Sequence, residues 1–384
     1  MNAPRKQRAS NIELMRVIAM IMIITFHITR HSIRDQLVDK SLISLFDISD
    51  CFCHPKFYPQ LMFLYLIMPM GKIGNGIFIL ISGYFMADRR IDLVRTGKKL
   101  IGQMAYMTLV LMFMSYTGFL LLYRHAEGVR VNLTNLERFN NNSWFIGYYI
   151  MVIIIAGLIL NRYLQKWNRK TYLVLLIVIF TVVSFGWSGD FLSGISENLR
   201  ILGVGIFYYS LGGYIRRYDP LRRVKGWVLA AIIAAINVLV MISYHNQVLD
   251  AIVDYQFGDK SSYFIQPFEV VPEYSWITVI LSICLFTLFT RLRIRPSRFI
   301  NFLGSATFMI YLFHDNSFIY SLWKYMNWIR PLKSAPAVFV SRYIAWVALI
   351  FITGTVLYVI YKKIEKQIIR VWNRHAGDAP SVQN

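Results

Sequence analysis

The chain alternates between long apolar stretches and short polar segments that are rich in basic residues. Its apolar stretches approach the length of about 20 residues that a helix needs to cross a bilayer. They cover residues 12–30, 61–87, 100–123, 144–160, 171–187, 199–215, 226–244, 275–290, 299–320 and 338–361. In lipid, a segment must satisfy its own backbone hydrogen bonds, so such stretches form helices. The pattern predicts an all-α, polytopic membrane protein with about ten transmembrane helices.

The second apolar stretch leaves two arrangements open. Residues 57–70 precede the glycine-rich sequence Gly-Lys-Ile-Gly-Asn-Gly. They either extend the second helix or lie along the outer face of the membrane. Because the basic segments on both sides of 12–87 should share the cytoplasm, an even number of crossings lies between them. Residues 12–87 therefore hold two transmembrane helices in either arrangement.

Charge refines this membrane topology. The 384 residues include 41 Lys and Arg against 20 Asp and Glu, which gives a net charge of +21. The cations are scattered in short clusters between apolar stretches, so no nucleic-acid-binding patch is expected. Their excess in alternate loops predicts that both termini are cytoplasmic. We expect residues 1–362 to form a single transmembrane domain and residues 363–384 a basic cytoplasmic tail.

The N-terminal arm and the cysteines exclude two other interpretations. The basic arm before the first apolar stretch resembles a signal peptide, but no small-residue cleavage site follows, so the stretch is expected to be retained. Cys51 and Cys53 lie in Cys-Phe-Cys-His, which offers at most three nearby zinc ligands. No bound metal is expected.

Ionisable residues in transmembrane segments are costly and are therefore candidates for function. The first apolar stretch carries Glu13, Arg16 and His27. Arg16 and His27 are separated by about 16 Å of helical rise and lie within about 20° of one face. Glu13 is one turn before Arg16 and can pair with it. His27 is either a reacting group or a histidine that bonds to a neighbouring helix.

A second polar pair, His314 and Asp315, follows the apolar sequence Met-Ile-Tyr-Leu-Phe. An aspartate beside a histidine can orient the imidazole, and a contact between helices explains the pair equally well. Trp144 begins another apolar stretch and is either part of an interfacial aromatic belt or a substrate contact. We take all three residues as candidate substrate-binding positions.

The segment 88–99 is the most basic loop of the first half of the chain. Its cations include Arg89, Arg90, Arg95 and Lys98. The positive-inside rule alone explains such a loop. The alternative is a binding site for the phosphates of a nucleotide-like molecule, because arginine grips phosphate in a bidentate manner.

These features together resemble the integral-membrane acyltransferase-3 family, which includes O-acetyltransferases of bacterial surface polysaccharides. The first helix is similar in its spacing of Arg16, ten residues and His27, and in its nearby Glu13. The sequence through Ser82 and Gly83 resembles the second-helix motif of the family, with Ile77 in place of one aromatic residue. Residues 95–98 occupy the place of a motif with two arginines, the second being lysine here.

The resemblance implies transfer of an acyl group, most often acetyl, from cytoplasmic acyl-CoA to a hydroxyl of a surface or lipid-linked carbohydrate. It implies location in the bacterial cytoplasmic (inner) membrane, in contact with lipid. His27 would act as general base or as acyl acceptor, Arg16 would assist it, and the basic loop would hold acetyl-CoA. The competing interpretations are a transporter or flippase of lipid-linked glycans, and a sensor or scaffold without activity.

Overall fold

A computed structural model of the chain describes residues 9–34, 58–121, 143–184, 196–257, 272, 274–323 and 326–377. Within these residues all regular structure is helical. The elements in chain order are α1 (Ser10–Ile28), η1 (Thr29–Ile33), α4 (Tyr58–Ile67), α5 (Met70–Met86), α6 (Leu93–Leu121), α8 (Trp144–Ile155), η4 (Ala156–Leu160), α9 (Asn161–Leu164), α10 (Arg169–Ser184), α11 (Ser196–Tyr218), α12 (Gly226–Phe257), α13 (Trp276–Arg291), α14 (Arg298–His314), α15 (Ser317–Trp323), α16 (Ile329–Leu332) and α17 (Pro336–Gly377).

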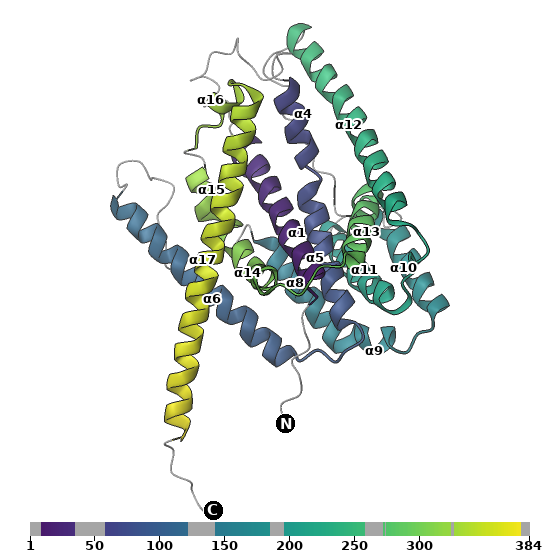
Figure 1. The fold of residues 1–384 in the computed structure, drawn as a ribbon, viewed down its shortest axis with the longest axis vertical. Coiled ribbons are helices and arrows are strands. Elements are labelled where there is room, and N and C mark those ends of the chain that lie inside the picture. Colours follow the sequence, from purple (N-terminus) through teal and green to yellow (C-terminus); the bar gives the residue numbers. More distant parts are fainter. Residues whose placement is uncertain are drawn as a thin grey trace, which may run out of the picture.

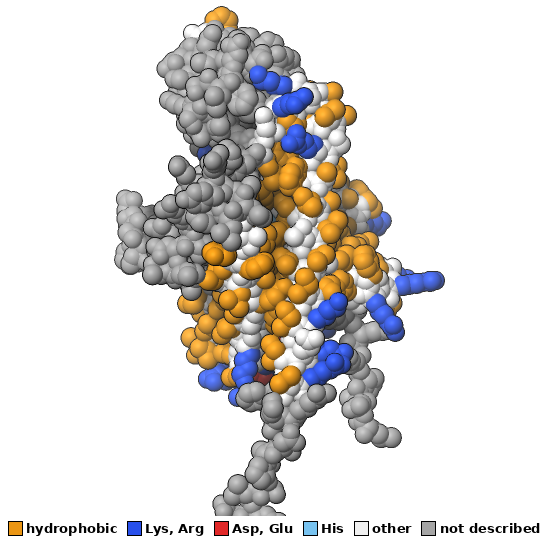
Figure 2. Space-filling model, turned by 90° about the vertical axis from the view of Figure 1, so that its left-hand side faces the viewer, with side chains coloured by type: hydrophobic (Ala, Val, Ile, Leu, Met, Phe, Trp, Pro, Cys, Tyr) orange, Lys and Arg blue, Asp and Glu red, His pale blue; other side chains and the backbone are white. Residues whose placement is uncertain are grey.

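Every apolar stretch found in the sequence overlaps at least one of these helices, which confirms the all-α prediction. Six helical segments in the described residues are long and apolar enough to cross a membrane. They are Ser10–Ile33, Tyr58–Met86, Leu93–Thr117, Trp144–Leu164, Gly226–Asp250 and Pro336–Val371. Figure 2 shows a broad apolar surface with Lys and Arg side chains gathered toward its two ends. The total of ten crossings and the orientation of the termini stay predictions.

The second span is a continuous column, α4 followed directly by α5 (Figure 1). Pro69 interrupts the backbone ladder because it has no N–H to donate. The ladder resumes one turn later, where the Ile73 N–H donates to the Pro69 carbonyl at 3.1 Å. Residues 58–67 therefore extend the second helix instead of lying along the membrane face. Residue 57 lies outside the described residues, as do Cys51 and Cys53.

The column of α4 and α5 and the helix α1 form the centre of the bundle. In their apolar windows, 78% and 67% of residues are buried, against 17–33% for the other spanning segments. Close contact between α5 and α11 depends on glycine. A Cβ on Gly83 would lie 1.9 Å from the Tyr209 carbonyl oxygen, and one on Gly212 would lie 2.2 Å from the Leu80 carbonyl oxygen. Small residues here let two helix backbones touch.

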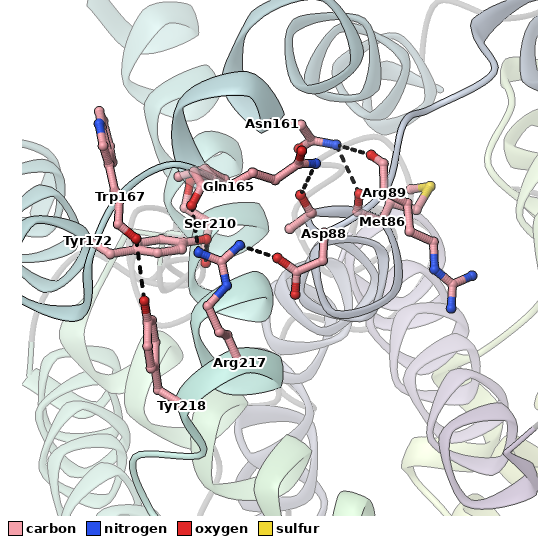
Figure 3. Close-up of polar contacts among 12 residues, drawn as sticks. Met86, Asp88, Arg89, Asn161, Gln165, Trp167, Tyr172, Ser210, Arg217 and Tyr218 are labelled. Carbon is pink, nitrogen blue, oxygen red and sulfur yellow. Dashed lines mark hydrogen bonds and ion pairs between the residues drawn. The ribbon is translucent and has the colours of Figure 1, made fainter.

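The end of α5 is held by side chains from two other helices (Figure 3). Asn161 Nδ2 donates at 2.9 and 3.0 Å to the carbonyls of Met86, the last residue of α5, and of Arg89, three residues beyond it. The Met86 carbonyl also accepts from the Arg89 N–H at 3.1 Å. Arg217 of α11 forms an ion pair with Asp88. The guanidinium of Arg89 points away from this network.

Two helices cover the side of α1 that carries His27. The helix α14 runs parallel to α1, because Gly304 contacts Glu13 near the start of both helices and the His314 ring lies 5.1 Å from the His27 ring near their ends. Tyr343 of α17 bonds to Thr29 at 2.8 Å. These contacts fix the rotation of α1 about its own axis.

The last helix passes the predicted domain boundary without a break. The boundary at residue 362 falls within α17, which continues to Gly377. The start of α1 and the end of α17 lie at the same end of the bundle (Figure 1). Residues 378–384 lie outside the described residues, and the division into domain and tail stays a prediction.

Candidate functional site

His27 lies in a buried cluster of aromatic and imidazole rings. His27 is only 5% exposed. The ring centroids of His31, Tyr311, His314 and Tyr320 lie 5.7, 6.2, 5.1 and 6.2 Å from that of His27. The cluster is assembled from α1, η1, α14 and α15. His27 therefore faces protein groups that can exchange protons and hydrogen bonds, and not lipid.

Asp315 sits at the break between α14 and α15, where its backbone leaves the helical conformation. Its carboxylate accepts hydrogen bonds from the hydroxyls of Tyr311 and Tyr320. The Ser143 hydroxyl donates to its backbone carbonyl. Asp315 Oδ1 lies 3.7 Å from His27 Nδ1. That separation is longer than a hydrogen bond, but catalytic contacts often shorten only when substrate binds.

The surroundings of the two histidines indicate which ring nitrogens carry protons. His314 Nδ1 lies 2.7 Å from the Ile310 carbonyl, which can only accept, so we assign the proton to Nδ1. His314 Nε2 is buried and has no hydrogen-bond partner among the described residues, and the same holds for His27 Nδ1. Because His27 Nδ1 faces a carboxylate, the Nδ1–H tautomer is favoured. This leaves the lone pair of His27 on Nε2.

A cavity of about 180 Å³ extends from Arg16 of α1 to Tyr311, at the edge of this cluster. Its polar lining includes Arg16, Ser82, Lys99, Gln103 and Tyr311. Tyr311 both lines the cavity and donates to Asp315, so the cavity comes within one side chain of the His27 cluster. The cavity thus extends from Arg16 to the edge of the His27 cluster, and His27 itself does not line it.

The residues around Arg16 form a second polar group. The expected ion pair is present, with Arg16 Nη1 3.1 Å from Glu13 Oε1. A Cβ on Gly304 would lie 2.2 Å from Glu13 Oε2, so this glycine makes room for the carboxylate. The Ser82 hydroxyl donates to the Phe78 carbonyl at 3.0 Å and lines the cavity.

The predicted donor-binding cations lie outside the cavity. Arg89, Arg90, Arg95 and Lys98 are exposed at the start of α6 and in the segment before it, and they do not line the space. The cation of this region that does line it is Lys99. The helix α6 is started by the Asp92 carboxylate, which accepts from the Arg95 N–H at 2.9 Å.

Trp144 lies at the first position of α8 and is 38% exposed. Lys72 Nζ lies 4.8 Å from the centre of its ring. Its neighbour Ser143 bonds to Asp315, so the start of α8 adjoins the histidine cluster. A ligand contact of Trp144 stays a prediction. In the described residues, no group of three His, Cys, Asp or Glu side chains is placed to hold a metal ion.

Four site residues were not identified from the sequence: Tyr311, Tyr320, Lys99 and Gln103. The tyrosines flank Asp315 in the chain, but only the break after α14 turns both hydroxyls onto one carboxylate. Lys99 and Gln103 carried a signal, because they continue a four-residue spacing that starts at Arg95 in an otherwise apolar helix.

Comparison with known proteins gave one finding. A family model described as an acyltransferase domain matches residues 10–362, which is most of the chain. No curated protein and no solved structure gave a match. The matched region begins at α1 and includes both His27 and the whole of the cavity lining.

Proposed function

This chain belongs to the acyltransferase-3 family, and on that premise we propose that it transfers an acyl group from cytoplasmic acyl-CoA to a hydroxyl of a carbohydrate. We further propose that the group is acetyl and that the acceptor is a cell-surface or lipid-linked polysaccharide. One observation carries the proposal: a single cavity extends from Arg16 to Tyr311, and Tyr311 donates a hydrogen bond to the Asp315 carboxylate that faces His27. The flippase interpretation gains no support from the family.

His27 is proposed as the general base. Its Nε2 takes the proton from the acceptor hydroxyl while the hydroxyl oxygen attacks the thioester carbonyl. The C–S bond then breaks, and the proton passes to the leaving thiolate. A base in this position typically contributes a factor of about 10² to 10⁴ in rate. The overall products are the acyl ester and free CoA.

Asp315 supports this role because it faces the other nitrogen of the ring. A carboxylate at Nδ1 holds the imidazole in one tautomer and stabilises the cation that forms when Nε2 is protonated. Tyr311 and Tyr320 hold the carboxylate in place. A covalent route, in which Nε2 attacks the thioester and carries the acyl group, uses the same residues. We favour the general-base route because Asp315 lies on the Nδ1 side of the ring, opposite the nitrogen that would take the proton.

The proposed donor and acceptor approach from opposite sides. Arg89, Arg90, Arg95 and Lys98 form an exposed cationic surface that attracts the phosphates of acyl-CoA before it enters the cavity. Trp144 and His314 would contact the sugar, and neutral His314 Nε2 can accept a hydrogen bond from a hydroxyl. This arrangement fits a multi-pass protein of the bacterial inner membrane with both termini in the cytoplasm.

The test uses membranes that contain the protein and labelled acetyl-CoA. We expect label in glycan with the wild type and none with His27→Ala, while the amount of protein in the membrane is unchanged. His245→Gln serves as a matched control, because it also replaces a histidine of a helix but at a position outside the proposed site. His245 lies on α12, where it is hydrogen-bonded to Tyr58 at 2.6 Å. If His27→Ala acetylates at the normal rate, the proposed role of His27 is wrong.

A further inference from the structure

The helix α6 turns one narrow face toward the bundle. Only 22% of the residues in its apolar window are buried. The buried positions Gln103, Met107 and Leu111 follow one another at intervals of four, with exposures of 1%, 1% and 0%. Arg95 and Lys99 continue the same row toward the start of the helix. One face of α6 therefore changes from charged to amide to apolar along its length.

Gln103 is the unusual member of this row. Its Oε1 is buried and has no hydrogen-bond partner among the described residues. A buried acceptor without a donor costs about 1–3 kcal/mol. Gln103 also lines the cavity, so a molecule in the cavity can supply the missing donor.

The two ends of the cavity are lined by different kinds of side chain. Lys99 lies about 6 Å before Gln103 along α6, since four residues of helix rise by that amount. Arg16 lines the same space from α1, beside Gly304 of α14. Tyr311 lies two turns further along α14, next to Asp315 and His27. Cations are thus found at one end of the cavity and Tyr311, which bonds to Asp315, at the other. On α6, Gln103 lies between Lys99 and the apolar part of the helix.

We propose that Gln103 Oε1 accepts a hydrogen bond from an amide N–H of the pantetheine arm of acyl-CoA, and that Lys99 and Arg16 lie beside the phosphate end of the same molecule. This inference rests on the proposed function. Acyl-CoA combines three properties that match the lining: anionic phosphates for its cationic end, amide N–H donors on a slender arm for Gln103, and a thioester at the tip. A fatty chain has no donor for Gln103 Oε1, and a neutral sugar has no anionic group.

The variant Gln103→Met tests the contact because it keeps the length of the side chain and removes the acceptor. The KM for acetyl-CoA should rise about 3- to 10-fold with little change in kcat, as expected for one neutral hydrogen bond. A second donor, the S-acetyl thioester of hexanethiol, has no amide, and its kcat/KM should not change. Met107→Leu is the matched control, one turn further along the same face and outside the cavity lining.

Thermal stability separates a binding effect from misfolding. Without ligand, Gln103→Met should be at least as stable as the wild type, because it removes a buried acceptor that lacks a donor. Addition of CoA should then stabilise the wild type more than the variant.

Two results would overturn the inference. In the first, Gln103→Met leaves the KM for acetyl-CoA unchanged. In the second, it changes only the KM for the acceptor, which would place a sugar hydroxyl at Gln103. Either result leaves the proposed function standing if the wild type still transfers label from acetyl-CoA. No transfer by the wild type would contradict the proposed function itself, and the inference with it.

Discussion

Replacement of Asp315 by Asn tests whether this carboxylate acts through its charge. The substitution keeps the size of the side chain and removes the negative charge that lies 3.7 Å from His27 Nδ1. When His27 takes a proton, a charge pair at this separation is worth about 4.5 kcal/mol for an effective dielectric constant of about 20. That energy corresponds to a loss of roughly 10³-fold in rate. The amide dipole of Asn recovers a part, so we expect a loss of about 10² to 10³.

The assay is the initial rate of acetyl transfer from labelled acetyl-CoA to glycan, at saturating donor and at equal amounts of protein in the membrane. Tyr320→Phe is the matched comparison, because it removes one hydrogen bond to Asp315 and leaves the charge. Its rate should fall only about tenfold, the lower end of the range for one hydrogen bond to a charged group, because the second tyrosine still bonds to the carboxylate. If Asp315→Asn keeps its rate within about threefold of the wild type, Asp315 does not stabilise a charged His27, and the proposed general-base arrangement is wrong.

Two further predictions concern helix packing and donor binding. Gly83→Ala should lower the stability of the detergent-solubilised protein by at least about 1–3 kcal/mol, because its Cβ would lie 1.9 Å from the Tyr209 carbonyl oxygen. Gly147→Ala, whose Cβ would have no neighbour within 4 Å, should be neutral or slightly stabilising in the same thermal-unfolding measurement, because alanine favours the helix over glycine. Arg95→Ala should raise the KM for acetyl-CoA. The rise should shrink as salt is added, because Arg95 is exposed and salt screens its charge. If the KM of the variant equals that of the wild type at low salt, Arg95 is not part of the donor-binding surface.

The sequence by itself determined the helices and the placement of the polar residues on the first of them. Apolar stretches of bilayer length become helices, because only a helix lets a single segment satisfy its own backbone hydrogen bonds in lipid. The spacing of Arg16 and His27 sets their shared side of α1, and the pairing of Glu13 with Arg16 follows from a separation of one turn. These properties depend only on residues close together in the chain.

Only the tertiary structure decided what each helix faces. The contact of His27 with Asp315 joins α1 to the break after α14, and the cavity needs side chains from α1, α5, α6, α8 and α14. Lipid is as apolar as most of these side chains, so hydrophobicity alone does not specify how helices rotate or pair. Close contacts at glycines such as Gly83 and a few polar bonds between helices make that choice. Each of them connects residues far apart in the sequence, which no local pattern reveals.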